Sequence, residues 1–138
     1  MKSRLCLALL CTLAGCSMKP KVLLDSDVPA PPEMDNRQTE DIRRRGADLV
    51  SAKAVYAGMI VDASSKLNGI SNRFRDNGWM VSRSSGDGIF AVGIYAKDDR
   101  RCRVRVSKNE LAPSMSRTSY LVYLEDEDVK VEGGAGGG

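Results

Sequence analysis

The side chains that most often do catalytic chemistry are scarce in this sequence. It contains no histidine, which removes the commonest general base and the commonest metal ligand. A serine nucleophile would then need a lysine base, and no Ser-x-x-Lys motif occurs. We therefore expect a protein that is not an enzyme, with no catalytic residues and with neither a metal nor another cofactor.

Two groups of carboxylates have the chemistry to attract calcium. Asp25 lies close to Asp27, and a second acidic group occupies residues 125–128. Neither group has the spacing of a calcium-binding loop, so we interpret both as solvated carboxylates. Gly-Asp-Gly at residues 86–88 lacks the pattern that surrounds a phosphate-binding loop, and we interpret it as a hairpin turn.

A short motif near the start of the chain indicates a role for a cysteine other than catalysis. Lys2 and Arg4 precede an apolar run at residues 5–13, which is the pattern of a secretory signal peptide. The run ends in Leu13-Ala14-Gly15-Cys16, which resembles the lipobox of bacterial lipoproteins. The resemblance implies that residues 1–15 are removed as a signal peptide. It also implies that Cys16 receives diacylglycerol and an acyl group such as palmitate on its amino terminus.

The same motif predicts where the protein is held. The apolar run is shorter than the roughly 20 residues of a membrane-spanning helix, and several acyl chains suffice for stable anchoring. We expect a lipid-anchored protein of the bacterial cell envelope that does not cross the membrane. Ser17, rather than an aspartate, follows the anchor. By resemblance to enterobacterial lipoproteins, this implies the outer membrane, with the protein facing the periplasm.

Charge and cysteine content limit the remaining possibilities. Removing Lys2 and Arg4 with the signal from the 21 basic residues leaves 19, against 18 acidic ones. This balance gives no reason to expect nucleic acid as a partner. With Cys16 lipidated and the two signal-peptide cysteines removed, Cys102 has no partner, so no intramolecular disulfide is expected.

Composition divides the mature chain into three parts. Residues 16–40 hold four of the five prolines and few core-forming residues, which predicts a lipid anchor followed by an extended, disordered tether. The alternative is a tail that packs along the domain between Val28 and Met34. Residues 41–128 are expected to form a small domain, and residues 129–138 a Gly-rich disordered tail.

One helix is expected at residues 62–77. Leu67, Ile70 and Phe74 fall on one stripe of a helix, and Gly78 follows where a left-handed C-cap belongs. Residues 46–58 alternate as in a strand, although their alanine content also suits a helix. We favour the strand.

After the helix the period changes to two. Strands are expected at residues 79–84, 89–96, 101–106 and 119–124, and the second is apolar on both faces, which marks a central strand. The third has the strictest alternation, which predicts an inward side with Cys102, Val104 and Val106 and an outward side with Arg101, Arg103 and Arg105.

These elements predict an α+β fold, in which one amphipathic helix packs on an antiparallel sheet of four to five strands, preceded by a disordered tether. The helix stripe is expected to bury its apolar residues against one face of the sheet, whose side chains include Trp79, Phe90, Val92, Ile94, Val104 and Val106. The other face should remain free.

A second resemblance covers most of the mature chain. The residues that carry it are Val28-Pro29, Tyr56-Ala57-Gly58, Phe74, Asn77-Gly78-Trp79, Lys97 and Cys102-Arg103-Val104, which recur in that order in a class of small, uncharacterised envelope lipoproteins. The resemblance implies a strand-helix-strands domain but no activity. The layout is also similar, by arrangement alone, to the helix-grip modules of outer-membrane assembly lipoproteins.

The free sheet face is the expected contact surface. Tyr95 and Tyr123 are in phase with the outward positions of their strands, so they are expected to join Arg101, Arg103 and Arg105 there. Arginine and tyrosine are favoured at interfaces, whereas the plainer interpretation is a solvated face that resists aggregation.

We expect a membrane-anchored lipoprotein that presents an α+β protein-interaction domain in the cell envelope, with a structural or assembly role. Its partners would be membrane lipid, through Cys16, and an unidentified envelope protein; no small-molecule substrate is evident. One alternative is a small-ligand-binding module with a cavity lined by Phe74 and Trp79. Another is a polyanion binder that uses the arginines.

Overall fold

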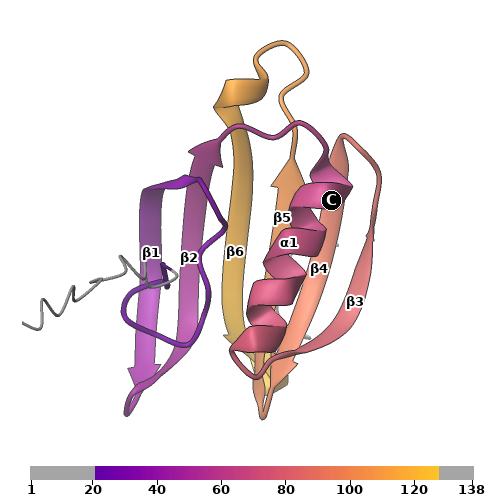
Figure 1. Ribbon diagram of the computed structural model, residues 1–138. Coiled ribbons are helices and arrows are strands. Elements are labelled where there is room, and N and C mark those ends of the chain that lie inside the picture. Colours follow the sequence, from indigo (N-terminus) through magenta and orange to yellow (C-terminus); the bar gives the residue numbers. More distant parts are fainter. Residues whose placement is uncertain (1–20, 128–138) are drawn as a thin grey trace, which may run out of the picture.

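The computed structural model describes residues 21–127, which form an antiparallel sheet of six strands with one helix on one face (Figure 1). The strand order in the sheet is β1-β2-β6-β5-β4-β3. Two 3₁₀ turns, η1 (Pro113–Met115) and η2 (Glu125–Glu127), flank the last strand. In chain order the main elements are β1 (Asp35–Arg45), β2 (Asp48–Gly58), α1 (Ala63–Asp76), β3 (Met80–Gly86), β4 (Phe90–Lys97), β5 (Arg100–Ser107) and β6 (Ser116–Leu124).

The α+β prediction is confirmed, but the sheet has six strands instead of four to five. The additional strand is β1, which lies mostly in the segment predicted as tether. Nearly all of its side chains are exposed, so it has no apolar alternation that would reveal a strand. Pairing with β2 holds β1 at the edge of the sheet. The charged side chains and register irregularities of β1 discourage pairing with other chains.

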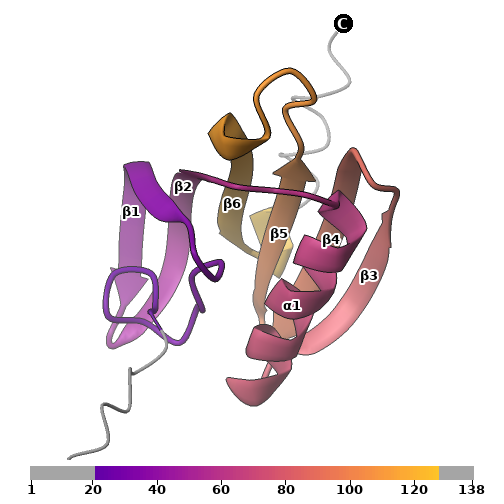
Figure 2. The ribbon, with the colours of Figure 1, turned by 45° about the horizontal axis from the view of Figure 1, so that its top comes forward.

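The tether prediction is also wrong for residues 21–34. This segment lies on the same face of the sheet as α1, beside it and over β1 and β2 (Figures 1 and 2). It closes a small loop through an isolated bridge between Val22 and Pro29. Its buried side chains belong to the main core and are Leu23, Val28, Ala30 and Met34. The alternative of a tail packed along the domain is correct between Val28 and Met34, and the packing also includes Leu23.

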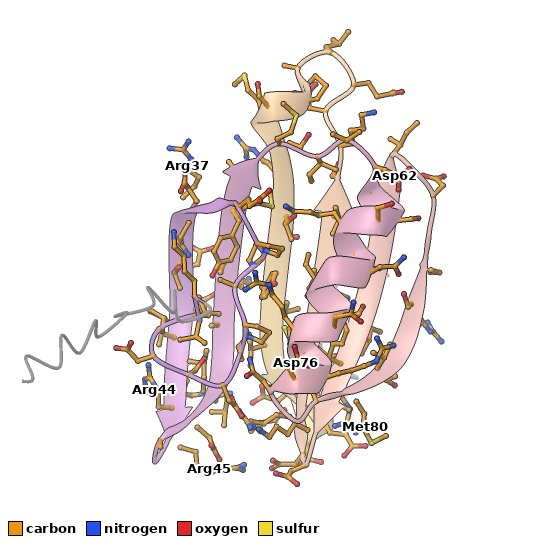
Figure 3. The ribbon with its side chains drawn as sticks, viewed as in Figure 1. Arg37, Arg44, Arg45, Asp62, Asp76 and Met80 are labelled. Carbon is orange, nitrogen blue, oxygen red and sulfur yellow. The ribbon has the colours of Figure 1, made fainter. Side chains whose placement is uncertain are left out.

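The predicted helix is confirmed as α1. The Asp62 carboxylate accepts a hydrogen bond from the Ser65 backbone N–H at 2.9 Å, which fixes the start of the helix. Gly78 has a φ of +84°, the left-handed conformation expected just after its end. Asp62 and Asp76 mark the two ends in Figure 3. The stripe of Leu67, Ile70 and Phe74 is buried against the sheet.

The remaining strand predictions are confirmed except for the phase of β4. Its buried residues are Ala91, Gly93 and Tyr95, so Phe90, Val92 and Ile94 point away from α1 and do not join the predicted core. Small inward residues leave room for the helix. A Cβ at Gly93 would lie 2.6 Å from the Tyr95 hydroxyl oxygen, so the large ring of Tyr95 is compensated by a glycine two residues earlier.

Three predicted features lie outside the described residues. They are the signal peptide at residues 1–15, the lipidated Cys16 and the Gly-rich tail at residues 129–138.

Candidate functional site

The sheet face opposite α1 is the candidate site. Among residues 21–127, no helix covers this face, which we call the open face; it is turned away from the viewer in Figure 1. The prediction for β5 is confirmed, since Cys102, Val104 and Val106 are fully buried on the other side. The open face is defined here by Lys53, Val55, Val92, Ile94, Arg101, Arg103, Arg105, Ser119 and Leu121.

Strand register sets the pattern of side chains on the open face. Arg103 lies between Leu121 of β6 and Ile94 of β4, and Arg105 lies between Ser119 and Val92. Each arginine therefore has an aliphatic side chain on at least one flank. The aliphatic residues are only partly exposed, while Arg105 is exposed. Charge and apolar surface alternate across the three strands.

The three arginines of β5 differ in their partners. Arg101 forms an ion pair with Glu125 at 3.0 Å. Within residues 21–127, neither Arg103 nor Arg105 has an ion-pair partner or a side-chain hydrogen bond. No other residue in the described part of the chain thus engages these two guanidinium groups on the open face.

A shallow hollow of about 220 Å³ lies beside these two arginines. Arg103 and Arg105 line one side and Lys53 of β2 lines the other, with β6 between them. Two inter-strand spacings make this gap roughly 10 Å wide. Within residues 21–127, Lys53 pairs with Asp41 alone, at 3.4 Å, and this pair is mostly exposed and therefore weak. The hollow is lined by three basic side chains and one acidic side chain, Glu40, so it suits an anionic group with apolar neighbours.

The two predicted tyrosines are placed differently. Tyr123 lies opposite Arg101 on the open face, but it is only 5 % exposed. Tyr95 was predicted outward and this is wrong, because it pairs with Cys102 and is fully buried under α1. Its ring stacks on Phe74 with centroids 3.9 Å apart, and its hydroxyl group hydrogen-bonds Ser71 at 2.6 Å. Burial raises the pKa of Tyr95 to about 12.

Sequence reasoning missed a charge cluster on the helix side of the sheet. The Arg100 guanidinium donates to both oxygens of the Asp27 carboxylate, at 2.8 and 2.7 Å. Lys97 donates to the same carboxylate at 2.8 Å and to the Asn77 carbonyl, at the end of α1, at 2.9 Å. The cluster therefore joins residues 21–34 to the β4–β5 hairpin and to α1.

Trp79 completes this cluster. Its indole N–H donates to the Asp27 carbonyl oxygen at 2.9 Å, and its ring lies 4.9 Å from the Arg100 guanidinium carbon. The hydrogen bond from Arg100 is the main reason that the pKa of Asp27 falls to about 2, against an opposing effect of partial burial. Asp27 is thus held as a carboxylate that already accepts from two cations, which suits a structural role rather than that of a base.

Cys102 is confirmed as a core residue. It is fully buried on β5, and burial raises the pKa of its thiol well above the usual range. A thiol in this environment stays protonated and is a poor nucleophile.

Comparison with known proteins assigns no family. No protein-family model matches the chain, and no curated protein sequence and no solved structure is significantly similar to it. In the part of the chain that the structure describes, no helix is long and apolar enough to span a membrane. The same residues contain no group of three or more His, Cys, Asp or Glu side chains arranged to hold a metal ion.

Proposed function

We propose that this protein is a non-enzymatic, lipid-anchored lipoprotein of the bacterial cell envelope, and that its α+β domain docks onto a partner protein through the open face. The anchor would be Cys16 in the outer membrane, with the domain in the periplasm. The observation that carries the docking role is the uncovered sheet face with Arg103 and Arg105 unpaired in residues 21–127.

The composition of the open face supports this role. Protein interfaces combine an apolar centre with a polar rim, and arginine is enriched in them. Val92, Ile94 and Leu121 provide partly exposed aliphatic surface, and the arginines stand among them. This mixture of charge and aliphatic surface is what the proposed docking role requires.

Packing on the other face favours docking over the binding of a small ligand between helix and sheet. Phe74 and Trp79, which would line such a cavity, are buried against each other with ring centroids 5.6 Å apart. Tyr95 fills the space on the other side of Phe74. The aromatic rings therefore occupy the position where the ligand would sit.

The folded segment at residues 21–34 changes how the proposed anchor would hold the domain. Only the backbone between Cys16 and Lys21 separates the lipid from folded structure, because Lys21 already hydrogen-bonds Ala30 through its carbonyl. Five residues of extended chain reach at most about 18 Å. The domain would therefore stay close to the bilayer, and its partner would be a protein of the same membrane or one that approaches it.

The anchor is tested by replacing the acylated residue. We expect the Cys16→Ser protein to lose incorporation of a fatty-acid analogue completely, since serine offers no thiol for the diacylglyceryl transfer. Labelling in cells, followed by gel fluorescence, measures this. The Cys102→Ser protein should be labelled like wild type, because Cys102 is buried. Labelling that persists in the Cys16→Ser protein would refute lipid anchoring.

Docking is tested by photo-cross-linking in cells with a photoreactive phenylalanine derivative. We expect the derivative in place of Leu121, on the open face, to give a discrete adduct with one envelope protein. At Asn68, which is exposed on α1 and thus on the opposite side, it should give none. Adducts of equal yield from both positions, or from neither, would contradict docking through the open face.

A further inference from the structure

We propose that the open face recognises an extended, acidic segment of its partner, with carboxylates on every second residue that pair with Arg103 and Arg105. This inference rests on the proposed docking function and names the chemistry of the partner. Four observations support it: an ion pair already made on β5, the spacing of the arginines, their lack of partners, and the apolar surface between them.

The chain itself shows how a carboxylate binds the column of arginines on β5, which consists of Arg101, Arg103 and Arg105. Glu125 follows β6 directly and pairs with Arg101, the first of the three, at 3.0 Å. The next two arginines of the column, Arg103 and Arg105, follow along β5, and their side chains project from the same side of the sheet. A carboxylate from another molecule can approach them as Glu125 approaches Arg101.

The spacing of the column matches that of an extended ligand. Residues two apart on a strand are about 6.7 Å apart on one face. An extended polypeptide laid along β5 repeats its own side chains at the same interval, so carboxylates at alternate positions match successive arginines. A helical segment would need its carboxylates at positions i and i+4, about 6 Å apart, so the two kinds of segment differ in the sequence pattern that matches the column.

Arg103 and Arg105 are available to a ligand because no described residue pairs with them. Several other arginines of β1 and β5 are engaged in ion pairs, Arg43 with Glu127, Arg45 with Asp99 and Arg100 with Asp27. Arg103 and Arg105 have no such partner among the described residues. Among residues 21–127, one acidic side chain lines their hollow, Glu40, and it lies on the far side.

The apolar residues favour a protein ligand over an anionic bilayer. Leu121 lies between Arg103 and Lys53, and Ile94 lies between Arg103 and Arg83, so both are partly buried among longer basic side chains. A polypeptide can place short side chains between the arginines and cover the aliphatic surface. Polyanions without apolar groups would use the charges alone.

The test uses a fluorescent peptide of four Glu-Thr repeats, with a Gln-Thr peptide of the same length as control. Alternating threonine favours an extended peptide. Binding to the full-length protein in non-ionic detergent is followed by fluorescence anisotropy. We expect binding of the Glu peptide that weakens as salt increases, and binding of the Gln peptide at least ten-fold weaker.

Two double variants place the binding site. The Arg103→Gln/Arg105→Gln protein should bind the Glu peptide at least ten-fold more weakly while melting at the wild-type temperature, because both side chains are outside the core. Arg37→Gln/Arg75→Gln is the matched control, since it removes the same charge from exposed positions on β1 and α1. Figure 3 shows Arg37 on the outer strand. Its affinity should stay within about two-fold of wild type.

Several results would overturn the inference. One is equal binding of the Glu and Gln peptides, and another is an equal loss of affinity for the Glu peptide in both double variants. Tighter binding to phosphatidylglycerol vesicles than to the peptide would also overturn it, as would peptide binding seen only after residues 128–138 are deleted. If the cross-link from position 121 persists while the peptide does not bind, the acidic-segment inference fails and the docking function stands. If the peptide binds but no cross-link forms, the docking function fails instead.

Discussion

Replacing Asp27 with asparagine should lower the free energy of unfolding by about 3 kcal/mol. The change keeps the shape of the side chain but leaves Arg100, whose side chain is only 3 % exposed, without its counter-charge. Breaking a buried ion pair by removing one partner costs about 3–5 kcal/mol, and the lower end applies because the Asp27 side chain is 29 % exposed. Urea titration followed by the fluorescence of Trp79, the only tryptophan, measures the change.

The same variant should show a changed response to acid. The pKa of Asp27 is about 2 in the folded state and 3.8 without its partners, so its stabilising effect is present above pH 3.8. This effect is lost as the pH falls through 3.8 toward 2. The free energy of unfolding of the wild type then falls by about 2 kcal/mol, whereas that of Asp27→Asn does not. The difference between wild type and Asp27→Asn should therefore shrink in acid.

Asp25→Asn is the matched control for both measurements. Asp25 is exposed, and its φ of +52° suits asparagine. Its unfolding free energy should stay within about 0.5 kcal/mol of wild type. An Asp27→Asn protein as stable as this control would show that the cluster does not hold residues 21–34 in place.

The cluster also shows why sequence reasoning missed the fold of residues 21–34. This segment is rich in proline and aspartate, as linkers are, and its apolar residues follow no period. Besides its four core side chains, the pairing of Asp27 with Arg100, 73 residues further along the chain, holds the segment in place. The sequence between residues 97 and 100 indicates only a turn, because nothing local shows that Lys97 and Arg100 share a distant carboxylate.

Strands were predicted where one face differs from the other. β5 alternates strictly between apolar residues and arginine, so its phase was correct. β4 is apolar on both faces, which left its phase open and put Tyr95 on the wrong side. β1 is polar on both faces and gave no signal. In each case the ladder of hydrogen bonds to neighbouring strands, not the alternation, decides the outcome.

The candidate site was predicted only in part for a similar reason. The arginines of β5 were found from their spacing, but their surroundings depend on strand order. The last strand, β6, is inserted between β2 and β5, which brings Lys53, Leu121 and Arg103 into one row. Such non-local pairing leaves no trace in the spacing of residues along one segment.

Replacing Val104 with aspartate should unfold the domain. Val104 is fully buried at the centre of β5, where it lies between Gly93 and Tyr120. A carboxylate there loses its hydration, and an uncompensated buried charge costs several kcal/mol or more. The Tyr120 hydroxyl group is buried and has no hydrogen-bond partner among residues 21–127, but one neutral donor does not offset a buried charge. The expected cost equals most or all of the 5–15 kcal/mol that typically stabilises a domain.

Arg105→Asp is the matched control, because it introduces the same carboxylate at the next position along β5 but on the open face. Arg105 is exposed and unpaired within residues 21–127, so this variant should keep the wild-type circular dichroism and a blue-shifted Trp79 emission. The Val104→Asp protein should lose both. If Arg105→Asp unfolds and Val104→Asp does not, the two faces of β5 are exchanged, and the open face cannot present the arginine column to a partner.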